Sequence, residues 1–451
     1  NISRRLRWDF HISGKKDNKT GFVLTAIVIG KRWGEMLDKN AVWKVNLYTL
    51  WVTQALVNMG MGLVIPFIPY YLEEMAVMST AQLNFYTGLS STLPAAAQAI
   101  ASPLWGHLSD RYGRKLMLVR AMICAVIVLF FMGIVNTVSI FLVLRVLQGI
   151  FTGTIPSAMA LVSAHTPEDK MSYALGFMTS SNFLGYAIGP VVGSVVCEVL
   201  GYEACFYFGA AVIAVGTVFV IALVKEDPTT YGLKLIEARK AAKLAGGSKV
   251  GLWTANFVMT LIVILIIRIG RTIFSPFIAL FVRDMIGGMD GATRYTGFVN
   301  MATCIATAVS SVTLTRLGDR YDKFKLASML SVVTLVISAF LPFSHTIWLF
   351  IGVYALYYFV IGAIEPVLTS GLSEKADPGQ RGALFGITAS VNSVGMMISP
   401  MIGASVSTAF SLQALPIVVS IFALAQVIFL VAEGMIKKKK PEDGENSGAD
   451  A

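Results

Sequence analysis

The chain has 451 residues, of which 55% are hydrophobic and 14% are charged. Soluble domains carry about 25% charged residues, so this composition excludes a disordered chain and argues against an ordinary soluble enzyme. The apolar residues would fill about a dozen membrane-spanning helices of roughly 20 residues each. The formal net charge of +10 does not indicate a nucleic-acid partner, because the basic residues lie in short clusters between apolar stretches and form no face interleaved with aromatic residues.

Taken in chain order, twelve apolar segments separated by short polar loops predict an all-α membrane protein. None of the segments alternates apolar and polar residues as a barrel strand does, and a helix is the other structure that satisfies every backbone group in lipid. The predicted spans are residues 45–72, 83–105, 116–135, 139–163, 173–197, 204–224, 252–282, 294–315, 326–343, 347–371, 383–407 and 413–436.

A polar stretch after the sixth span divides the chain into two halves. In the N-terminal segment the apolar run Phe22 to Ile29 is too short to cross a bilayer. Met36 stands just before the first span, and Lys31 to Glu35 could be encoded by codons that resemble a ribosome-binding site, so our hypothesis is that Met36 is the true start. The predicted divisions are an N-terminal cytoplasmic segment at 1–41, a six-helix half at 42–225, a cytoplasmic linker at 226–251, a second six-helix half at 252–436 and a charged cytoplasmic tail at 437–451.

The distribution of Lys and Arg over the loops predicts the orientation in the membrane. If the N-terminus is cytoplasmic, the inner loops and the C-terminal tail hold twenty Lys and Arg residues, whereas the outer loops hold only Arg283 and Arg294. Basic loops stay on the cytoplasmic side of a membrane. We therefore predict a multi-pass protein of the plasma membrane with both termini in the cytoplasm.

The two halves repeat each other at a nearly constant offset. At an offset of 210 residues, Pro66-Phe67-Ile68 in span 1 meets Pro276-Phe277-Ile278 in span 7, and 8 of the 21 positions from 176 to 196 are identical to their counterparts in span 11. Each repeat has an even number of spans, so both insert in the same direction. This arrangement implies a two-fold axis along the membrane normal and a cavity between the halves.

The loop between spans 2 and 3 reads Gly106-His-Leu-Ser-Asp110-Arg111-Tyr-Gly113-Arg114-Lys115. Gly106 allows helices to approach closely, Gly113 permits a tight turn, and Asp110 can cap a neighbouring helix N-terminus. A degraded copy, Gly318-Asp319-Arg320-Tyr321-Asp322, has Asp322 in place of the turn glycine. On the residues alone, a charged turn that keeps its basic residues inside is the alternative interpretation.

Spans 4 and 5 each carry a motif of polar or small residues. Span 4 contains Arg145-Val-Leu-Gln148-Gly149, and an arginine within a span needs a partner in protein or water unless it reaches outward to the interface. Span 5 contains Gly185-Tyr-Ala-Ile-Gly189-Pro190-Val-Val-Gly193-Ser194. Its small residues at four-residue spacing allow a close helix crossing, and Pro190 is expected to bend the span.

These three motifs resemble the signatures of the major facilitator superfamily, and the resemblance covers about residues 42–436. In that family the loop motif latches the two halves in one conformation, the span 4 motif is associated with proton coupling, and the span 5 motif marks the drug/proton antiporter branch, although Ser194 replaces its last glycine. The resemblance implies twelve helices and rocker-switch export in exchange for protons. The residues expected to form the latch are Gly106, Asp110, Arg111, Gly113, Arg114, Asp319 and Arg320.

Glu365 in span 10 is the only acidic residue far from any span end, and Pro366 follows it. A buried carboxylate is costly when it is ionised and unpaired, so a carboxyl that gains and loses a proton as access alternates would suit proton coupling. We predict that Glu365 does this alone or together with Arg268 or Arg145. A fixed ion pair, or a neutral carboxyl bonded to a backbone group loosened by Pro366, is the structural alternative.

Span 7 carries Arg268 and Arg271, which share one helix face. The two positive charges of these arginines exceed the single negative charge of Glu365. Either one arginine therefore reaches water or the site receives an anionic group. Internal amides concentrate in spans 1, 2, 5, 8 and 11, whereas spans 3, 6, 9 and 12, the outer helices of the family fold, hold only Gln426. Each amide by itself more often joins two helices than binds a substrate. The predicted substrate cavity contains Arg271, Gln54, Asn58, Gln98, Gln148, Asn182, Asn300 and Asn392.

Other chemistries find no support in the sequence. It contains no phosphate-binding Walker loop, no HExxH or GxSxG motif and no cluster of His and Cys, so we predict no enzymatic activity, metal or cofactor. Its four cysteines are expected to be free thiols, although Cys197 and Cys205 flank one loop and can bridge.

The favoured function is a monomeric, proton-coupled exporter of amphipathic drugs or other small molecules in the lipid bilayer. One alternative is an exporter of an endogenous anionic metabolite or glycolipid, held by Arg268 and Arg271. A more remote one is a membrane receptor or scaffold that transports nothing.

Overall fold

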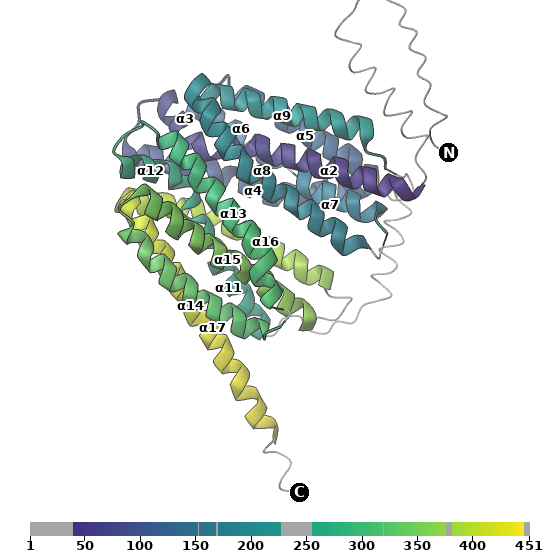
Figure 1. The fold of residues 1–451 in the computed structure, drawn as a ribbon, viewed down its shortest axis with the longest axis vertical. Coiled ribbons are helices and arrows are strands. Elements are labelled where there is room, and N and C mark those ends of the chain that lie inside the picture. The colour runs from purple at the N-terminus through teal and green to yellow at the C-terminus, as the bar shows by residue number, and fades with distance from the viewer. Residues whose placement is uncertain are drawn as a thin grey trace, which may run out of the picture.

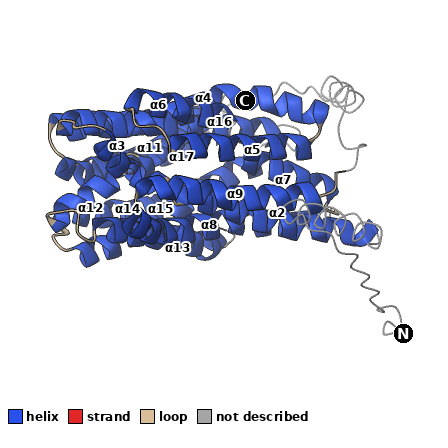
Figure 2. Cartoon of the chain, turned by 90° about the horizontal axis from the view of Figure 1, so that it is seen from above, coloured by secondary structure: helices blue, strands red, loops and turns tan. Residues whose placement is uncertain are grey.

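The computed structural model describes residues 39–151, 153–167, 170–226, 255–318, 320–375 and 381–445. Within these ranges every regular element is a helix, which confirms the predicted all-α class, and Figure 2 shows the helices packed side by side along one direction. The hypothesis about Met36 and the predicted linker beyond Glu226 fall outside the described residues.

The helices of the first half overlap the six predicted spans, although α4 continues seven residues beyond its predicted end through Asp110 and Arg111. Hydropathy locates the apolar part of a span, but a helix can continue into the charged residues beside it. The elements of this half are α2 (Lys39–Gly62), η1 (Ile65–Phe67), α3 (Ile68–Met75), α4 (Thr80–Tyr112), α5 (Arg114–Met132), α6 (Val138–Phe151), α7 (Thr154–His165), α8 (Met171–Leu200) and α9 (Tyr202–Leu223).

The second half repeats the pattern. The last helix runs through Glu445, so part of the segment predicted as a tail is helical. The elements are α11 (Ala255–Thr272), η4 (Ser275–Phe277), α12 (Ile278–Ile286), α13 (Ala292–Leu317), α14 (Lys323–Phe340), η5 (Leu341–Phe343), α15 (Ile347–Lys375), α16 (Arg381–Ala409), η6 (Leu412–Ala414) and α17 (Leu415–Glu445).

Spans 1 and 7 break at the same point of the repeat. The short η1 and η4 helices begin at Ile65 and Ser275, which are 210 residues apart, and each holds the proline of the repeated Pro-Phe-Ile triplet. Proline removes a backbone donor and clashes with the preceding turn, so both helices interrupt there and resume as α3 and α12. The internal repeat is therefore present in the backbone as well as in the sequence.

Span 4, predicted as one helix, consists of two, α6 and α7. Gly153 lies between them with φ +131°, and it is the N-terminal boundary residue of α7. A side chain would be strained in this left-handed conformation. The break falls near the middle of the span, where it contributes to the central cavity.

The two halves, α2 to α9 and α11 to α17, lie side by side and contact each other most closely at one end (Figure 1). We call the end at which α2 and α11 begin the near end, and the end with the α3–α4 and α12–α13 loops the far end. At the far end, Tyr70 donates to the carbonyl of Ala279 at 2.5 Å, and the hydroxyls of Tyr202 and Thr293 are 3.0 Å apart. These bonds between buried groups close the far end.

The near end is open. Among the described residues, a Cβ added at Gly106 on α4, at Gly176 on α8 or at Gly386 on α16 would meet no atom of another segment within 4 Å. At mid-height Gly88 on α4 lies against Pro400 and Ala404 of α16, at 2.8 and 2.7 Å from such a Cβ. The structure therefore shows one conformation of a two-ended molecule, closed at the far end and open at the near end.

The glycines of the span 5 motif form a tight crossing, as predicted. A Cβ at Gly185, Gly189 or Gly193 of α8 would lie 2.4 to 2.8 Å from a backbone oxygen of α2 or of the turn that follows it. On its other side α8 contacts the second half, because a Cβ at Gly297 of α13 would meet the Ser194 side chain at 2.9 Å. Backbone packing on backbone replaces side-chain interlocking at this contact.

The outer position of α5, α9, α14 and α17 agrees with the distribution of polar residues. These helices expose large apolar side chains such as Ile127, Val215, Val336 and Ile421. Among the described residues, eleven helices are long and apolar enough to cross a membrane. The predicted second span, α4, is not one of them, because its polar residues lower its hydropathy. An inner helix can carry such residues, and α4 packs on α6 and α16.

The near end also holds a cap that the sequence did not predict. Glu226 caps α5, because its carboxylate accepts from the backbone N–H groups of Arg114 at 2.7 Å and Lys115 at 2.9 Å. Glu226 therefore contacts the first half. The expected capping role of Asp110 stays a prediction. In the second half Asp322, which replaces the turn glycine, caps α14 itself by accepting from Lys325 N at 2.9 Å.

We predict that Glu226→Ala lowers the stability of the first half. The substitution removes both acceptors from the α5 N-terminus, where loss of a cap costs about 1 kcal/mol and loss of an anion about 0.3 to 1 kcal/mol. Thermal unfolding in detergent should show a lower midpoint, and Glu226→Gln, which keeps one acceptor oxygen, should fall between. An unchanged midpoint for Glu226→Ala would mean that the cap contributes nothing.

Candidate substrate and proton-coupling site

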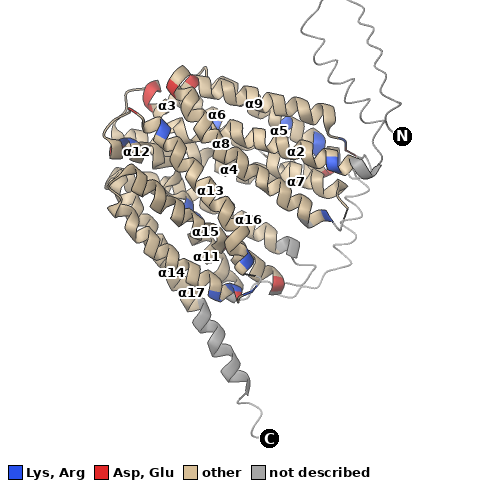
Figure 3. Ribbon diagram, viewed as in Figure 1, with Lys and Arg blue, Asp and Glu red and all other residues tan. Residues whose placement is uncertain are grey.

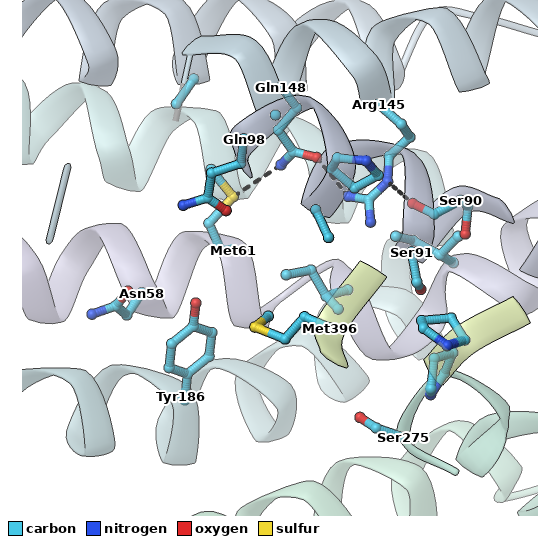
Figure 4. A pocket seen from close by; sticks show the side chains of 18 of the residues that line it. Asn58, Met61, Ser90, Ser91, Gln98, Arg145, Gln148, Tyr186, Ser275 and Met396 are labelled. Atoms are coloured by element: carbon cyan, nitrogen blue, oxygen red, sulfur yellow. Dashed lines mark hydrogen bonds between the residues drawn. The ribbon is translucent and has the colours of Figure 1, made fainter. Parts of the chain in front are cut away.

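A cavity of about 340 Å³ lies between the halves at mid-height. Helices α2, α4, α5, α6 and α7 of the first half form most of its wall, with Tyr186 from α8, and α11, η4, α13 and α16 of the second half complete it. Figure 4 shows its polar side chains among apolar ones. The polar lining residues are Asn58, Thr87, Ser90, Ser91, Gln98, Arg145, Gln148, Thr154, Tyr186, Thr272, Ser275 and Asn300.

Arg145 is the charged residue in this lining, and only 5% of it is exposed. Its Nε donates to the carbonyl of Ser90 at 2.8 Å, and Nη1 donates to Oε1 of Gln148 at 2.5 Å. Gln148 in turn contacts the sulfur of Met61 at 3.2 Å. The predicted span 4 motif thus forms one network, in which Gln148 orients the arginine.

The predicted cavity residues divide into two groups. Asn58, Gln98, Gln148 and Asn300 line the cavity. The others, Gln54, Asn182, Arg271 and Asn392, do not. Two of these act as helix joints: Asn182 accepts from Asn58 at 2.7 Å, and Asn392 contacts the charged pair described next. Gln54 is 1% exposed, and its amide atoms have no hydrogen-bond partner among the described residues.

Glu365 of α15 lies in a three-residue network with Arg268 of α11 and Asn392 of α16. Nη2 of Arg268 is 3.3 Å from the Glu365 carboxylate, and Nδ2 of Asn392 donates to Oε1 of Glu365 at 2.6 Å. Nε of Arg268 donates to Oδ1 of Asn392 at 2.8 Å. Each residue therefore bonds to the other two, and the expected partnership of Glu365 with Arg268, not with Arg145, is present.

The network is accessible rather than sealed. The side chains of Arg268 and Glu365 are 20% and 16% exposed. Thr272 and Met396, one turn further along α11 and α16 from Arg268 and Asn392, line the cavity. The charged network therefore lies one turn closer to the open near end, where water can reach it.

The position of Arg268 depends on Gly395. A Cβ at Gly395 would lie 2.6 Å from Cγ of Arg268, so the arginine stem crosses α16 over a residue without a side chain. Arg271, on the same face of α11, stacks its guanidinium 5.6 Å from the ring of Tyr358. It has no carboxylate partner among the described residues, so it adds positive charge to this side of the molecule.

The predicted latch residues lie at the near end, and their role as a latch stays a prediction. A Cβ added at Gly106, which was expected to allow a close approach, would meet no described atom of another segment within 4 Å. Arg111 stacks on the adjacent Tyr112, and Arg320 is exposed. Gly113 confirms the predicted turn with φ +102°, and the guanidinium of Arg114 donates to the carbonyl of Ala160 at 2.9 Å within the first half. Asp319 lies outside the described residues.

The far end carries two ion pairs between the halves that sequence reasoning missed. Arg283 of α12 pairs with Glu73 of α3, and Arg294 of α13 pairs with Glu198 of α8 at 2.8 Å. Glu73 and Arg283 are 210 residues apart, so the repeat places opposite charges at equivalent positions. The repeat offset itself was a signal that could have revealed this pair.

We predict that Glu73→Arg opens the far end and that the charge swap Glu73→Arg with Arg283→Glu closes it again. Neutralising an exposed pair costs only about 0 to 1 kcal/mol, whereas two facing arginines repel each other. An Ala292→Cys reporter, fully buried at the far end, should react with maleimide several-fold faster in Glu73→Arg when native cysteines are replaced by serine. Equal labelling of the single variant and the swap would contradict this gate.

The site and fold together define a class of protein. A helical membrane bundle in two equivalent halves, with a central cavity open at one end and closed at the other, has the architecture of a secondary transporter with alternating access. The chain belongs to the major facilitator superfamily, because the profile of that family matches residues 50–287 and 260–451. It is therefore a multi-pass membrane transporter.

Similar proteins agree with this membership. The chain is 30% identical over 392 residues to the multidrug resistance protein MdtG of Enterobacter lignolyticus, and the match covers 86% of this chain and 91% of that protein. It is 28% identical to the multi-drug resistance efflux pump PmrA homolog of Lactococcus lactis, over 87% of this chain and 95% of that protein.

Solved structures of low sequence identity share the fold. A bacterial homolog of the human lysosomal transporter Spinster, in an inward-facing and occupied conformation, matches with a TM-score of 0.71 at 12% identity over 88% of this chain and 97% of that one. The nucleoside transporter NupG matches with a TM-score of 0.68 at 14% identity over 86% of this chain and 98% of that one.

Proposed function

We propose that the protein exports amphipathic small molecules from the cytoplasm across the plasma membrane in exchange for protons. Relatives that align over most of the chain are named multidrug resistance proteins and efflux pumps, which supports export of drug-like compounds. The observation that carries proton coupling is the accessible network of Glu365, Arg268 and Asn392.

The network provides a physical route from a proton to a conformational change. Ionised Glu365 holds Arg268 and Asn392 through an ion pair and a hydrogen bond. A proton on Glu365 removes the ion pair and leaves Arg268 without its counter-charge at the cavity wall, where an unpaired charge is costly. The three residues lie on α11, α15 and α16, so their relaxation shifts the packing of three helices of the second half.

The near end is proposed to face the cytoplasm. Lys and Arg gather at the near end and Asp and Glu occur at the far end (Figure 3), as expected when basic segments stay inside. With this orientation the structure represents an inward-facing state, both termini are cytoplasmic, and the far-end ion pairs are the external gate. Since each chain contains both halves of its own cavity, we propose that the monomer is the transporting unit.

Proteoliposomes test this function even before the substrate is identified. Liposomes that contain the pH dye pyranine and an acidic interior are mixed with a panel of amphipathic dyes and antibiotics of different charge. If the protein exchanges a compound for protons, that compound should make the interior alkaline faster than in protein-free liposomes, and an uncoupler should remove the difference. A panel in which compounds enter without any proton movement would contradict coupling.

The alternative is export of an endogenous anion held by Arg268 and Arg271. The structure argues against these two arginines as the anion site, although a third arginine is suitably placed. Arg268 is already paired with Glu365, and neither arginine lines the central cavity. Arg145 does line it, and the anionic class of substrate is argued on that residue below.

A further inference from the structure

We infer that the central cavity selects substrates with an anionic group attached to an apolar body, that Arg145 holds this group, and that the N-terminus of α7 adds positive potential to the same cavity wall. The inference rests on the proposed function, because it names the substrate class of the same cavity. The shared chemistry is that of an organic acid such as a carboxylate, sulfonate or phosphonate.

Arg145 has a positive charge without a counter-charge. Both of its hydrogen-bond acceptors, the Ser90 carbonyl and the Gln148 amide, are neutral, and it forms no ion pair with a described carboxylate. Placing an arginine in a nearly dry site without a carboxylate is costly. An anion in the cavity would provide the missing charge.

One terminal nitrogen of the Arg145 guanidinium is available to bind a ligand. Two of its nitrogens are engaged, and the third carries no bond to a described residue and points into the cavity (Figure 4). Gln148 and Ser90 fix the plane of the group, so the ordering cost of a bound ligand is small. A planar arginine with free N–H groups matches the two oxygens of an acid group.

The break in span 4 adds a second attraction. Gly153, Thr154 and Ile155 line the same cavity, and the twelve-residue helix α7 starts there with no side-chain cap. The first N–H groups of a helix have no partner inside it and attract anions. The two features come from one span, with Arg145 two turns before the break and the helix N-terminus directly after it.

The remaining charges and contacts point the same way. Three arginines, Arg145, Arg268 and Arg271, lie inside the described spans, and the one carboxylate that the structure pairs with any of them is Glu365 on Arg268. A cationic substrate therefore meets a surplus of positive charge. The rest of the lining is mostly apolar and includes Met61 and Met396, whose flexible thioethers adapt to different shapes. This wall fits the body of an amphipathic acid.

A matched dye pair tests the inference. 1-Anilinonaphthalene-8-sulfonate and N-phenyl-1-naphthylamine differ only in the sulfonate, and both report binding by fluorescence. Purified full-length protein in phosphatidylcholine nanodiscs should bind the sulfonate at least tenfold more tightly than the neutral dye. Arg145→Gln should remove this preference and leave affinity for the neutral dye within twofold, while Arg145→Lys should retain part of it. Arg316→Gln, which removes an arginine outside the cavity lining, is the control and should change neither affinity.

The outcomes separate this inference from the proposed function. Tighter binding of the neutral dye or of ethidium, no binding of the sulfonate, or an unchanged preference in Arg145→Gln would each overturn it. Binding needs no proton gradient, so Glu365→Gln should keep the preference for the anion even where proton exchange is lost. A second set of nanodiscs with phosphatidylglycerol, whose headgroup carries a net negative charge that phosphatidylcholine lacks, shows whether an anionic lipid competes for the site, which would assign the anion to a lipid rather than to a free acid.

Discussion

Glu365→Gln is expected to reduce substrate-dependent proton movement to the level of protein-free liposomes. Glutamine keeps the size and one acceptor oxygen of the side chain, so the bond from Asn392 can persist, but it cannot take up a proton. Arg268 then has no counter-charge in either state of the cycle. Substrate exchange at equal pH on both sides should continue, because it requires the cavity and the gates but no net proton transfer.

Glu374→Gln is the matched control for this experiment. Glu374 lies on the same helix, α15, and pairs with Lys323 at the near end, away from the Glu365 network. Its substitution should leave proton movement within the range of the wild type. Proton movement that persists in Glu365→Gln would remove Glu365 as the coupling residue, and loss of equal-pH exchange in the same variant would show that the substitution damages the transport cycle itself.

Gly193→Ala is expected to destabilise the protein severely. Its Cβ would lie 2.4 Å from the carbonyl oxygen of Leu63 and 2.9 Å from Leu63 Cα. Overpacking of a core costs typically about 1 to 3 kcal/mol, and here the obstacle is backbone, which cannot rotate away as a side chain can. We expect a loss near the upper end of that range and little folded protein after extraction into detergent.

Gly176→Ala provides the comparison on the same helix. A Cβ at Gly176 meets open space, and alanine favours a helix by roughly 0.5 to 1 kcal/mol over glycine. Thermal unfolding followed by size-exclusion chromatography should therefore give an equal or higher midpoint for Gly176→Ala and a much lower one for Gly193→Ala. Similar midpoints for the two variants would mean that the α2–α8 crossing is not as close as the structure shows.

Much of the architecture could be predicted because it depends on local sequence. Span positions follow from hydropathy, and the close α2–α8 crossing follows from the glycine spacing of one segment. Hydropathy does not reveal the break at Gly153, because the apolar run continues through it. Gly153 and Pro156 were the available signals, since both residue types often mark an interruption of a helix. The polar character of α4 can be interpreted only once its neighbours are known.

The site could be predicted only in part, because its residues meet across long distances in sequence. Glu365 and Arg268 stand out as charges inside spans, but their joint contact with Asn392 depends on how α11, α15 and α16 pack. The latch prediction presupposes one conformation, and a sequence does not say which of two alternating states is populated. The contact of Glu226 with the α5 N-terminus was missed because a carboxylate three residues beyond a helix gives no sign that it caps another helix far away in the chain.

The most direct test of the central claim counts the protons released when substrate binds to purified protein in weakly buffered detergent solution. The compound used is the one that moves most protons in the liposome panel. If the network of Glu365, Arg268 and Asn392 exchanges a proton for substrate, a series of measurements over pH should find proton release on binding by the wild type, and Glu365→Gln should bind the compound without any release. Equal proton release by the two proteins would contradict the account.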